Sequence, residues 1–137
     1  MEQPKVTGKR FETGFHILNQ WLCLRQRGRR LFPYFEDNLV RRAAIYGMGA
    51  LGERLYEELQ GGGVSVVYAV DRAAGKKNIP GLKIYGSQEE TLPEADVMIV
   101  TPVQDYWAVV AMMETKTKAA IVSLADIIEY CALEGDR

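Results

Sequence analysis

Apolar and polar residues follow two distinct patterns from residue 43 onward. Short apolar runs, several of them rich in β-branched residues and followed by glycine or a polar turn, are typical of buried strands. The stretches between them repeat apolar residues at helical spacing, as Leu51, Leu55 and Leu59 do. The apolar runs predict strands over residues 43–47, 64–70, 83–85, 97–100 and 119–124.

Helices are predicted between these strands and before the first of them. Glycines and polar turns punctuate the pattern, and they set the expected ends of each helix. In the second part of the chain, helices are predicted over 50–60, 104–115 and 125–132, with a polar loop over 72–78 and a short helical turn at Ser87. In the first part, we expect a loose polar leader over 1–10, a helix over 13–27 that stops at Gly28, and a short helix over 31–38 with Pro33 in its first turn.

Strands that alternate with helices predict an α/β fold with a parallel sheet covered on both faces. Right-handed crossovers favour a doubly wound sheet of about five strands in the order 3-2-1-4-5. We interpret residues 41–137 as this domain and residues 1–40 as an N-terminal helical extension. One face of the extension must cover either the flank of the sheet or a second subunit. That face consists of Phe15, Leu18, Trp21 and Leu22.

Composition excludes several classes of protein. The formal net charge of -1 gives no reason to expect nucleic acid as a partner, and no apolar run approaches a membrane span. The first ten residues lack the apolar centre of a signal peptide, so we expect a cytoplasmic protein with Cys23 and Cys131 as buried, reduced thiols. One histidine, His16, and no clustered cysteines argue against a metal site.

The candidate chemistry centres on the loop Gly47-Met48-Gly49-Ala50-Leu51-Gly52. It has the form G-x-G-x-x-G, follows a predicted strand and opens a predicted helix. Gly47 allows the tight turn, Gly49 allows a pyrophosphate to approach the backbone, and Gly52 allows the helix to pack closely on the strand. Phosphates would then bind at the free N–H groups of the helix start. The loop therefore predicts a dinucleotide-binding domain of the Rossmann type.

Asp71 supports this interpretation independently. It ends the second predicted strand, 19 residues after Gly52, where such folds place the carboxylate that binds the adenosine ribose. A carboxylate there repels a 2′-phosphate and so favours NAD over NADP, although the adjacent Arg72 weakens that preference. Glu53 counts against the interpretation, because it places negative charge near the expected phosphates. The alternative is that the glycines serve only a tight turn and that Asp71 caps a loop.

Two further groups of residues have candidate roles. Thr101 and Pro102 end the fourth predicted strand at the switch point of the sheet. Together with Gln104 they would line the nicotinamide or sugar side of a cleft. The alternative is that they only end a strand and start a helix. A basic set could form a phosphate or acidic-partner patch, but two of its members lie before the first strand, roughly 17 Å from the glycine loop. The set consists of Arg25, Arg27, Arg29, Arg30, Arg41 and Arg42.

The sequence names no catalytic residues. No tyrosine in it is followed by a lysine four positions later, as in short-chain dehydrogenases, and no nucleophile is paired with a base. His16 lies next to the apolar face of the predicted first helix, where a packing role is expected. If the chain is an enzyme, its chemistry therefore requires a partner.

Several segments resemble a known kind of module. Residues 45–52, 68–71 and 97–102, together with Asn19-Gln20-Trp21-Leu22 and the basic run after it, look like a small Rossmann module of bacterial cell-surface polysaccharide gene clusters. This module is similar to the N-terminal nucleotide-sugar-binding half of sugar acetyltransferases, and the resemblance covers about residues 15–130. It implies a nucleotide or nucleotide-sugar ligand and a glycosyltransferase-type partner. The chain ends at Arg137 without the catalytic β-helix of those enzymes, so their activity is not implied.

These observations lead to one main hypothesis and two alternatives. The main hypothesis is a stand-alone module that binds a nucleotide, with NAD(H) first and nucleotide sugars or CoA as alternatives, in an accessory or sensing role in surface-glycan metabolism. The first alternative is an NAD-dependent dehydrogenase or epimerase that acts on a nucleotide sugar. The second is an interaction scaffold that binds no nucleotide and presents the N-terminal helix and its arginines. Whichever hypothesis holds, the N-terminal helix is the expected contact for a homodimer or for a glycosyltransferase-type protein.

Overall fold

A computed structural model describes residues 3–134 of the protein; residues 1 and 2 of the expected leader lie outside this range. Five parallel strands form one sheet in the order β3-β2-β1-β4-β5, as predicted. Each strand lies within one residue of its expected bounds. The two central strands, over residues 42–46 and 97–100, are buried except for Arg42, because helices cover the sheet on both faces. The strands are β1 (Arg42–Tyr46), β2 (Ser65–Val70), β3 (Ile84–Tyr85), β4 (Val97–Val100) and β5 (Ala120–Ser123).

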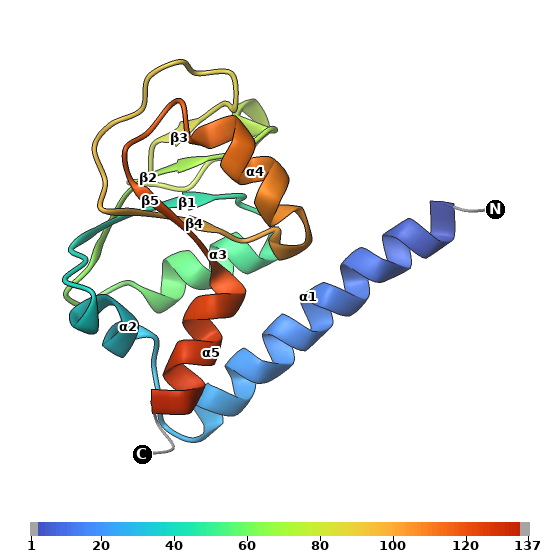
Figure 1. The fold of residues 1–137 in the computed structure, drawn as a ribbon, viewed down its shortest axis with the longest axis vertical. Coiled ribbons are helices and arrows are strands. Elements are labelled where there is room, and N and C mark those ends of the chain that lie inside the picture. Colours follow the sequence, from blue (N-terminus) through green and yellow to red (C-terminus); the bar gives the residue numbers. More distant parts are fainter. Residues whose placement is uncertain (1–2, 135–137) are drawn as a thin grey trace.

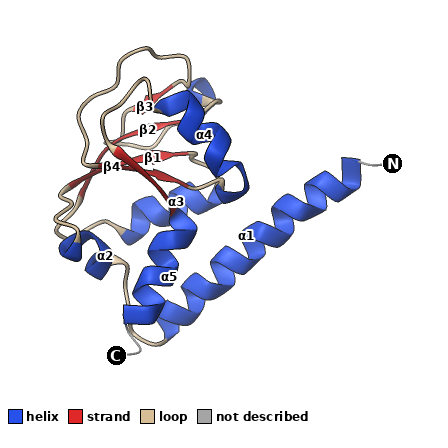
Figure 2. Cartoon of the chain, in the orientation of Figure 1, coloured by secondary structure: helices blue, strands red, loops and turns tan. Residues whose placement is uncertain are grey.

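Helices cover both faces of the sheet (Figures 1 and 2). Successive residues of β1 face opposite ways: Ala43 and Ile45 join one buried cluster, and Ala44 and Tyr46 join the other. The first cluster lies under α1, α2, α3 and α5, and the second lies under α4. The helices are α1 (Gln3–Gln26), α2 (Phe32–Asp37), α3 (Ala50–Glu58), α4 (Tyr106–Met113) and α5 (Leu124–Glu134).

Three predicted segments differ in detail. The helix expected over 104–115 begins with a 3-10 turn, η2 (Val103–Asp105), and continues as α4. Ser87 lies in a simple turn in which Glu89 N–H donates to the carbonyl of Gly86, and it starts no helix. The loop expected over 72–78 contains the 3-10 turn η1 (Ala74–Lys76).

Helix α1 is longer than predicted. It begins at Gln3, so the expectation of a loose leader was wrong for residues 3–10. Proline is tolerated in the first turn of a helix, so Pro4 does not prevent this start. Gly28 ends the helix as predicted, with φ at +78°, a value that glycine adopts without strain.

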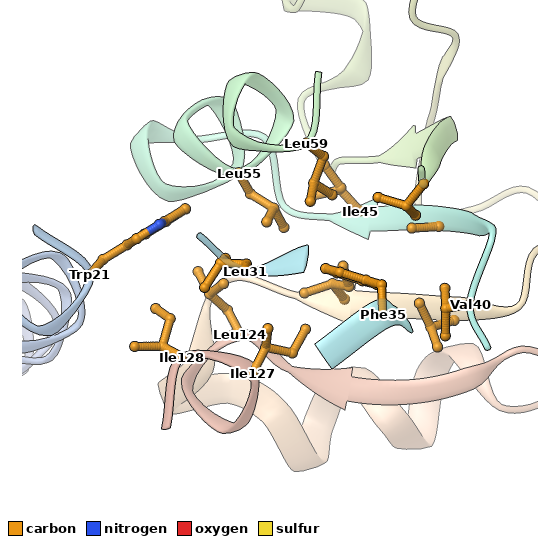
Figure 3. Packing of buried hydrophobic residues seen from close by; sticks show 14 of the residues in the cluster. Trp21, Leu31, Phe35, Val40, Ile45, Leu55, Leu59, Leu124, Ile127 and Ile128 are labelled. Carbon is orange, nitrogen blue, oxygen red and sulfur yellow. The ribbon is translucent and has the colours of Figure 1, made fainter. Parts of the chain in front are cut away.

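The buried face of α1 shares only Trp21 with the predicted apolar face. Ile17, Trp21 and Leu24 are buried, whereas Phe15, Leu18 and Leu22 are exposed. Trp21 reaches from α1 toward Leu55 of α3 (Figure 3). Two apolar faces with helical spacing overlap on this helix. The face expected to cover either the flank of the sheet or a second subunit covers the flank only through Trp21. Cys23 lies on α1 and is exposed, whereas Cys131 is buried. The expectation of two buried thiols therefore holds only for Cys131.

A buried carboxylate joins the extension to the sheet domain. Glu58 at the end of α3 is 4% exposed. Its Oε1 lies 2.6 Å from Nη1 of Arg25, and its Oε2 accepts hydrogen bonds from Nε of Arg30 at 2.9 Å and from the N–H of Leu31 at 3.1 Å. Arg30 also donates to the main-chain carbonyl of Glu58. Two arginines of the basic set therefore hold the turn between α1 and α2 against α3.

Arg41 and Arg42 lie at the N-terminal edge of β1, as expected. Their backbone N–H groups both donate to Oδ2 of Asp96 at 2.9 Å. These hydrogen bonds are the main reason that the pKa of Asp96 is lowered, and the Arg42 and Arg41 charges add to the effect. This pair of arginines thus fastens β1 to the start of β4, on the edge of the sheet opposite the glycine loop.

Candidate functional site

The candidate site lies at the carboxyl edge of the sheet. The loops that follow β1, β2 and β4 meet there, where β1 is flanked by β2 on one side and β4 on the other. Open α/β sheets bind their ligands at this switch point. The structure brings the glycine loop, Asp71 and the Thr101-Pro102 pair together at this edge, because each directly follows one of the three strands.

Gly47 and Gly52 have no room for a side chain. Gly47 has φ at +95°, and a Cβ there would lie 2.6 Å from Oγ1 of Thr101 and 2.7 Å from Cδ of Pro102. A Cβ on Gly52 would lie 2.0 Å from the carbonyl oxygen of Gly47. Gly52 is therefore the point of close contact between α3 and the strand turn, which is the role predicted for it.

Gly49 differs from these two glycines. It precedes α3 in an extended conformation, and an added Cβ would meet no atom within 4 Å. No side chain caps the helix at this position, and both Gly49 and Ala50 are exposed. Space is therefore open at the helix N-terminus, where the macrodipole favours an anion. Glu53 in the first turn is exposed, which weakens this field.

The other two members of the loop contribute differently. The side chain of Met48 is fully buried in the cluster beneath α3, so only its backbone is available near the loop surface. Leu51 is partly buried and packs on the same cluster. Direct contact with a ligand therefore falls to Gly49, Ala50 and the backbone N–H groups around them.

Asp71 is oriented toward the glycine loop. Its Oδ2 accepts a hydrogen bond from the N–H of Met48 at 2.6 Å, and its Oδ1 accepts one from the N–H of Ala73 at 2.7 Å. An ionised carboxylate has about four acceptor positions, so about two remain for hydroxyl groups of a ligand. Arg72 beside it is exposed. Asp71 thus positions the loop and retains acceptor positions beside it.

Thr101 and Pro102 form the side of the site next to β4. The Thr101 hydroxyl lies 2.7 Å from the carbonyl oxygen of Gly47 and 3.1 Å from that of Tyr46, and the side chain is buried. It therefore fixes the strand turn and does not reach into open space. Pro102 is partly buried against Gly47 and leaves one surface toward solvent.

Two residues near the site, Tyr46 and Asp105, were not predicted from the sequence. Tyr46 ends β1 beside Arg72; burial raises the pKa of its phenol, and the Arg72 guanidinium partly opposes this shift. Tyr46 therefore stays protonated at neutral pH and keeps a hydroxyl hydrogen to donate. Asp105 in η2 accepts a hydrogen bond from Nη1 of Arg10 at 3.0 Å, which ties α1 to the loop after β4. No local motif marks these residues, because only the topology brings them near the loop.

Glu58 was also missed, but the sequence held a signal for it. It lies seven residues after Leu51 and three after Leu55, on the same helical face as these leucines. A carboxylate on a core-facing position, in a chain with a basic run nearby, indicates a buried ion pair.

Neither a metal centre nor a membrane span is found within residues 3–134. No group of three or more His, Cys, Asp or Glu side chains in this range could hold a metal ion. None of the described helices is both long and apolar enough to cross a bilayer.

Comparison with known proteins gives no family assignment. No protein-family profile matches the chain, and no curated protein is significantly similar to it.

Proposed function

We infer that this protein binds a dinucleotide or related nucleotide at the glycine loop, with NAD(H) as the first ligand to test. The observation that carries this inference is the open, uncapped N-terminus of α3 at Gly49, with the Asp71 carboxylate held against the same loop. A tight turn alone would require Gly47 and Gly52. It would not require Gly49, where a side chain would fit, to be glycine.

The geometry suggests how such a ligand would lie. Its pyrophosphate would accept hydrogen bonds from backbone N–H groups at the start of α3, near Gly49 and Ala50. The adenosine ribose hydroxyls would donate to the remaining acceptor positions of Asp71. The second half of the ligand would extend past Pro102 toward Asp105, on the β4 side of the switch point.

The cellular role that we propose rests on the resemblance to modules of polysaccharide gene clusters. In that setting the protein would be a cytoplasmic accessory or sensing module, and a nucleotide sugar or CoA would be the alternative ligand. A glycosyltransferase-type protein is the corresponding partner. The resemblance, and not the site geometry, is what supports this part of the proposal.

Titration calorimetry tests the ligand directly. The protein would be titrated with NAD⁺, NADH, UDP-sugars and CoA in parallel. We expect saturable binding of at least one of them with a stoichiometry of one per chain. Absence of binding by all four at millimolar concentration would overturn the proposal and favour a scaffold with no nucleotide.

Replacing Asp71 by asparagine should weaken NAD⁺ binding by about 10- to 100-fold, because one oxygen that accepts from the loop or from the ribose becomes an N–H donor. Calorimetry measures the change, and a thermal melt of the same sample reports whether the fold is retained. Glu53→Gln is the matched control on the other side of the loop. It removes a negative charge near the phosphates and should tighten binding slightly. Equal weakening by both variants would contradict the assigned roles.

A further inference from the structure

An apolar stripe on α1 is exposed to solvent. Phe11, Phe15, Leu18 and Leu22, which we call the α1 stripe, are 74%, 65%, 40% and 56% exposed. The opposite face of the same helix is anchored in the core, and the N-terminal end points away from the sheet (Figure 1). Within residues 3–134 of a single copy, the stripe therefore remains uncovered.

The spacing of the stripe is typical of a helix that pairs with another helix. Its members are separated by 4, 3 and 4 residues, which are the a and d positions of a heptad repeat. A seam this narrow is the pattern of coiled coils, whereas a helix that packs on a sheet has a broader apolar face. The residue types also fit, because all four are large and apolar.

The area of the stripe is comparable to the largest apolar patch on a typical monomer, and such patches are often functional. With about 200 Å² for each fully exposed side chain, it leaves on the order of 450 Å² of apolar surface, within the range of about 300–600 Å² for the largest patch on a typical monomer. Two such stripes facing each other would bury about 900 Å². That is close to the roughly 1,000 Å² that a specific interface needs before its polar rim is counted.

A groove adjoins the stripe. It has a volume of about 310 Å³; Leu18 and Leu22 of α1 lie along one side, and Arg54 and Glu57 of α3 lie along the other. A second helix placed along the stripe would therefore touch α3 as well as α1. Its larger apolar side chains would fill the groove, and its polar side chains would meet both a positive and a negative group.

We propose that a second copy of this chain occupies this surface, so that two α1 helices pair in antiparallel orientation. Antiparallel pairing aligns Phe11 with the partner's Leu22 and Phe15 with the partner's Leu18. Each pair of facing side chains along the seam then combines one phenyl ring with one leucine, so the two helices are separated by the same distance at every pair. In parallel pairing, phenyl rings would face phenyl rings and leucines would face leucines, so the distance between the helices would differ from one pair to the next.

The antiparallel arrangement also explains the position of the groove. The leucines of the stripe line it, and antiparallel pairing places the partner's phenyl rings beside these leucines. The stripe is thus complementary to itself across a two-fold axis, as an isologous interface requires. No residue of the glycine loop takes part, so the pairing holds or fails independently of nucleotide binding.

Sedimentation velocity of the full chain tests the pairing. At micromolar to millimolar concentration we expect a species of twice 15.4 kDa. Phe15→Glu should raise the dissociation constant at least about 100-fold, because it buries a carboxylate in an apolar seam twice in each dimer. Gln20→Glu makes the same change of charge on the same helix but off the stripe, and it should leave the dimer intact. A wild-type chain that stays monomeric throughout would overturn the proposal.

Cysteine crosslinking tests the orientation. Phe11→Cys and Leu22→Cys would be made separately in a Cys23→Ser background, which removes the exposed thiol of α1. In the antiparallel pair, only a mixture of the two variants forms a covalent dimer under mild oxidation, because a disulfide requires Cα atoms within about 7 Å. Crosslinking of either variant with itself would instead indicate a parallel pair and contradict the proposed geometry.

Discussion

Gly52→Ala is expected to lower the free energy of unfolding by about 3 kcal/mol, the upper end of the usual range for overpacking, and to abolish nucleotide binding with it. The new methyl group would lie 2.0 Å from the carbonyl oxygen and 3.0 Å from the carbonyl carbon of Gly47, both of them backbone atoms that cannot rotate away. The clash is relieved only if α3 moves off the strand. Such movement opens the packing of Leu55 and Leu59, which are buried between the helix and the sheet.

Gly49→Ala is the matched control for this prediction. An added Cβ there meets no atom, and the backbone conformation suits alanine, so the free energy of unfolding should change by less than about 1 kcal/mol. The methyl group would nevertheless stand where phosphates approach, so affinity should fall while stability remains. Urea denaturation and calorimetry on the two variants measure these effects separately. Equal destabilisation by both would show that close helix packing is not the function of Gly52.

Glu58→Ala is expected to cost about 3–5 kcal/mol, the range measured when one partner of a buried ion pair is removed. The variant leaves Arg25, Arg30 and the N–H of Leu31 without the acceptor that now satisfies all three. Both guanidinium groups are partly exposed and can regain some water, which places the expected loss toward the lower end of the range. Chemical denaturation monitored by tryptophan fluorescence follows the loss, because Trp21 packs nearby.

Glu57→Ala provides the comparison one residue away. Glu57 is exposed and pairs with Arg54 at the surface at 3.2 Å, a contact worth about 0.5 kcal/mol or less. Glu58→Gln keeps the shape of the side chain but removes its charge, and it should fall between the two alanine variants. If Glu58→Ala proved as mild as Glu57→Ala, the buried carboxylate would not be what holds the extension to the domain.

The strand order and the glycine loop were predictable because both depend on local signals. Short apolar runs identify the strands, handedness restricts their order, and the loop stands at a fixed place between a strand and a helix. Such local signals do not determine which face of α1 is buried. Its two apolar faces share helical spacing, and periodicity cannot say which of them the rest of the chain covers. The contact between Thr101 and Gly47 likewise depends on strands that are distant in sequence.

The extension and the sheet domain share one buried core, so we expect the two to unfold together. Trp21 and Leu24 of α1 lie in the same buried cluster as Leu55 of α3. The ion pair between Arg25 of α1 and Glu58 of α3 links the two helices further. Contacts of this kind usually make a single cooperative unit, whose amide hydrogens exchange only when the whole unit opens. Amides in the C-terminal half of α1 should therefore exchange as slowly as those of the central strands. Amides near its N-terminal end should exchange by local fraying, unless a second helix protects them.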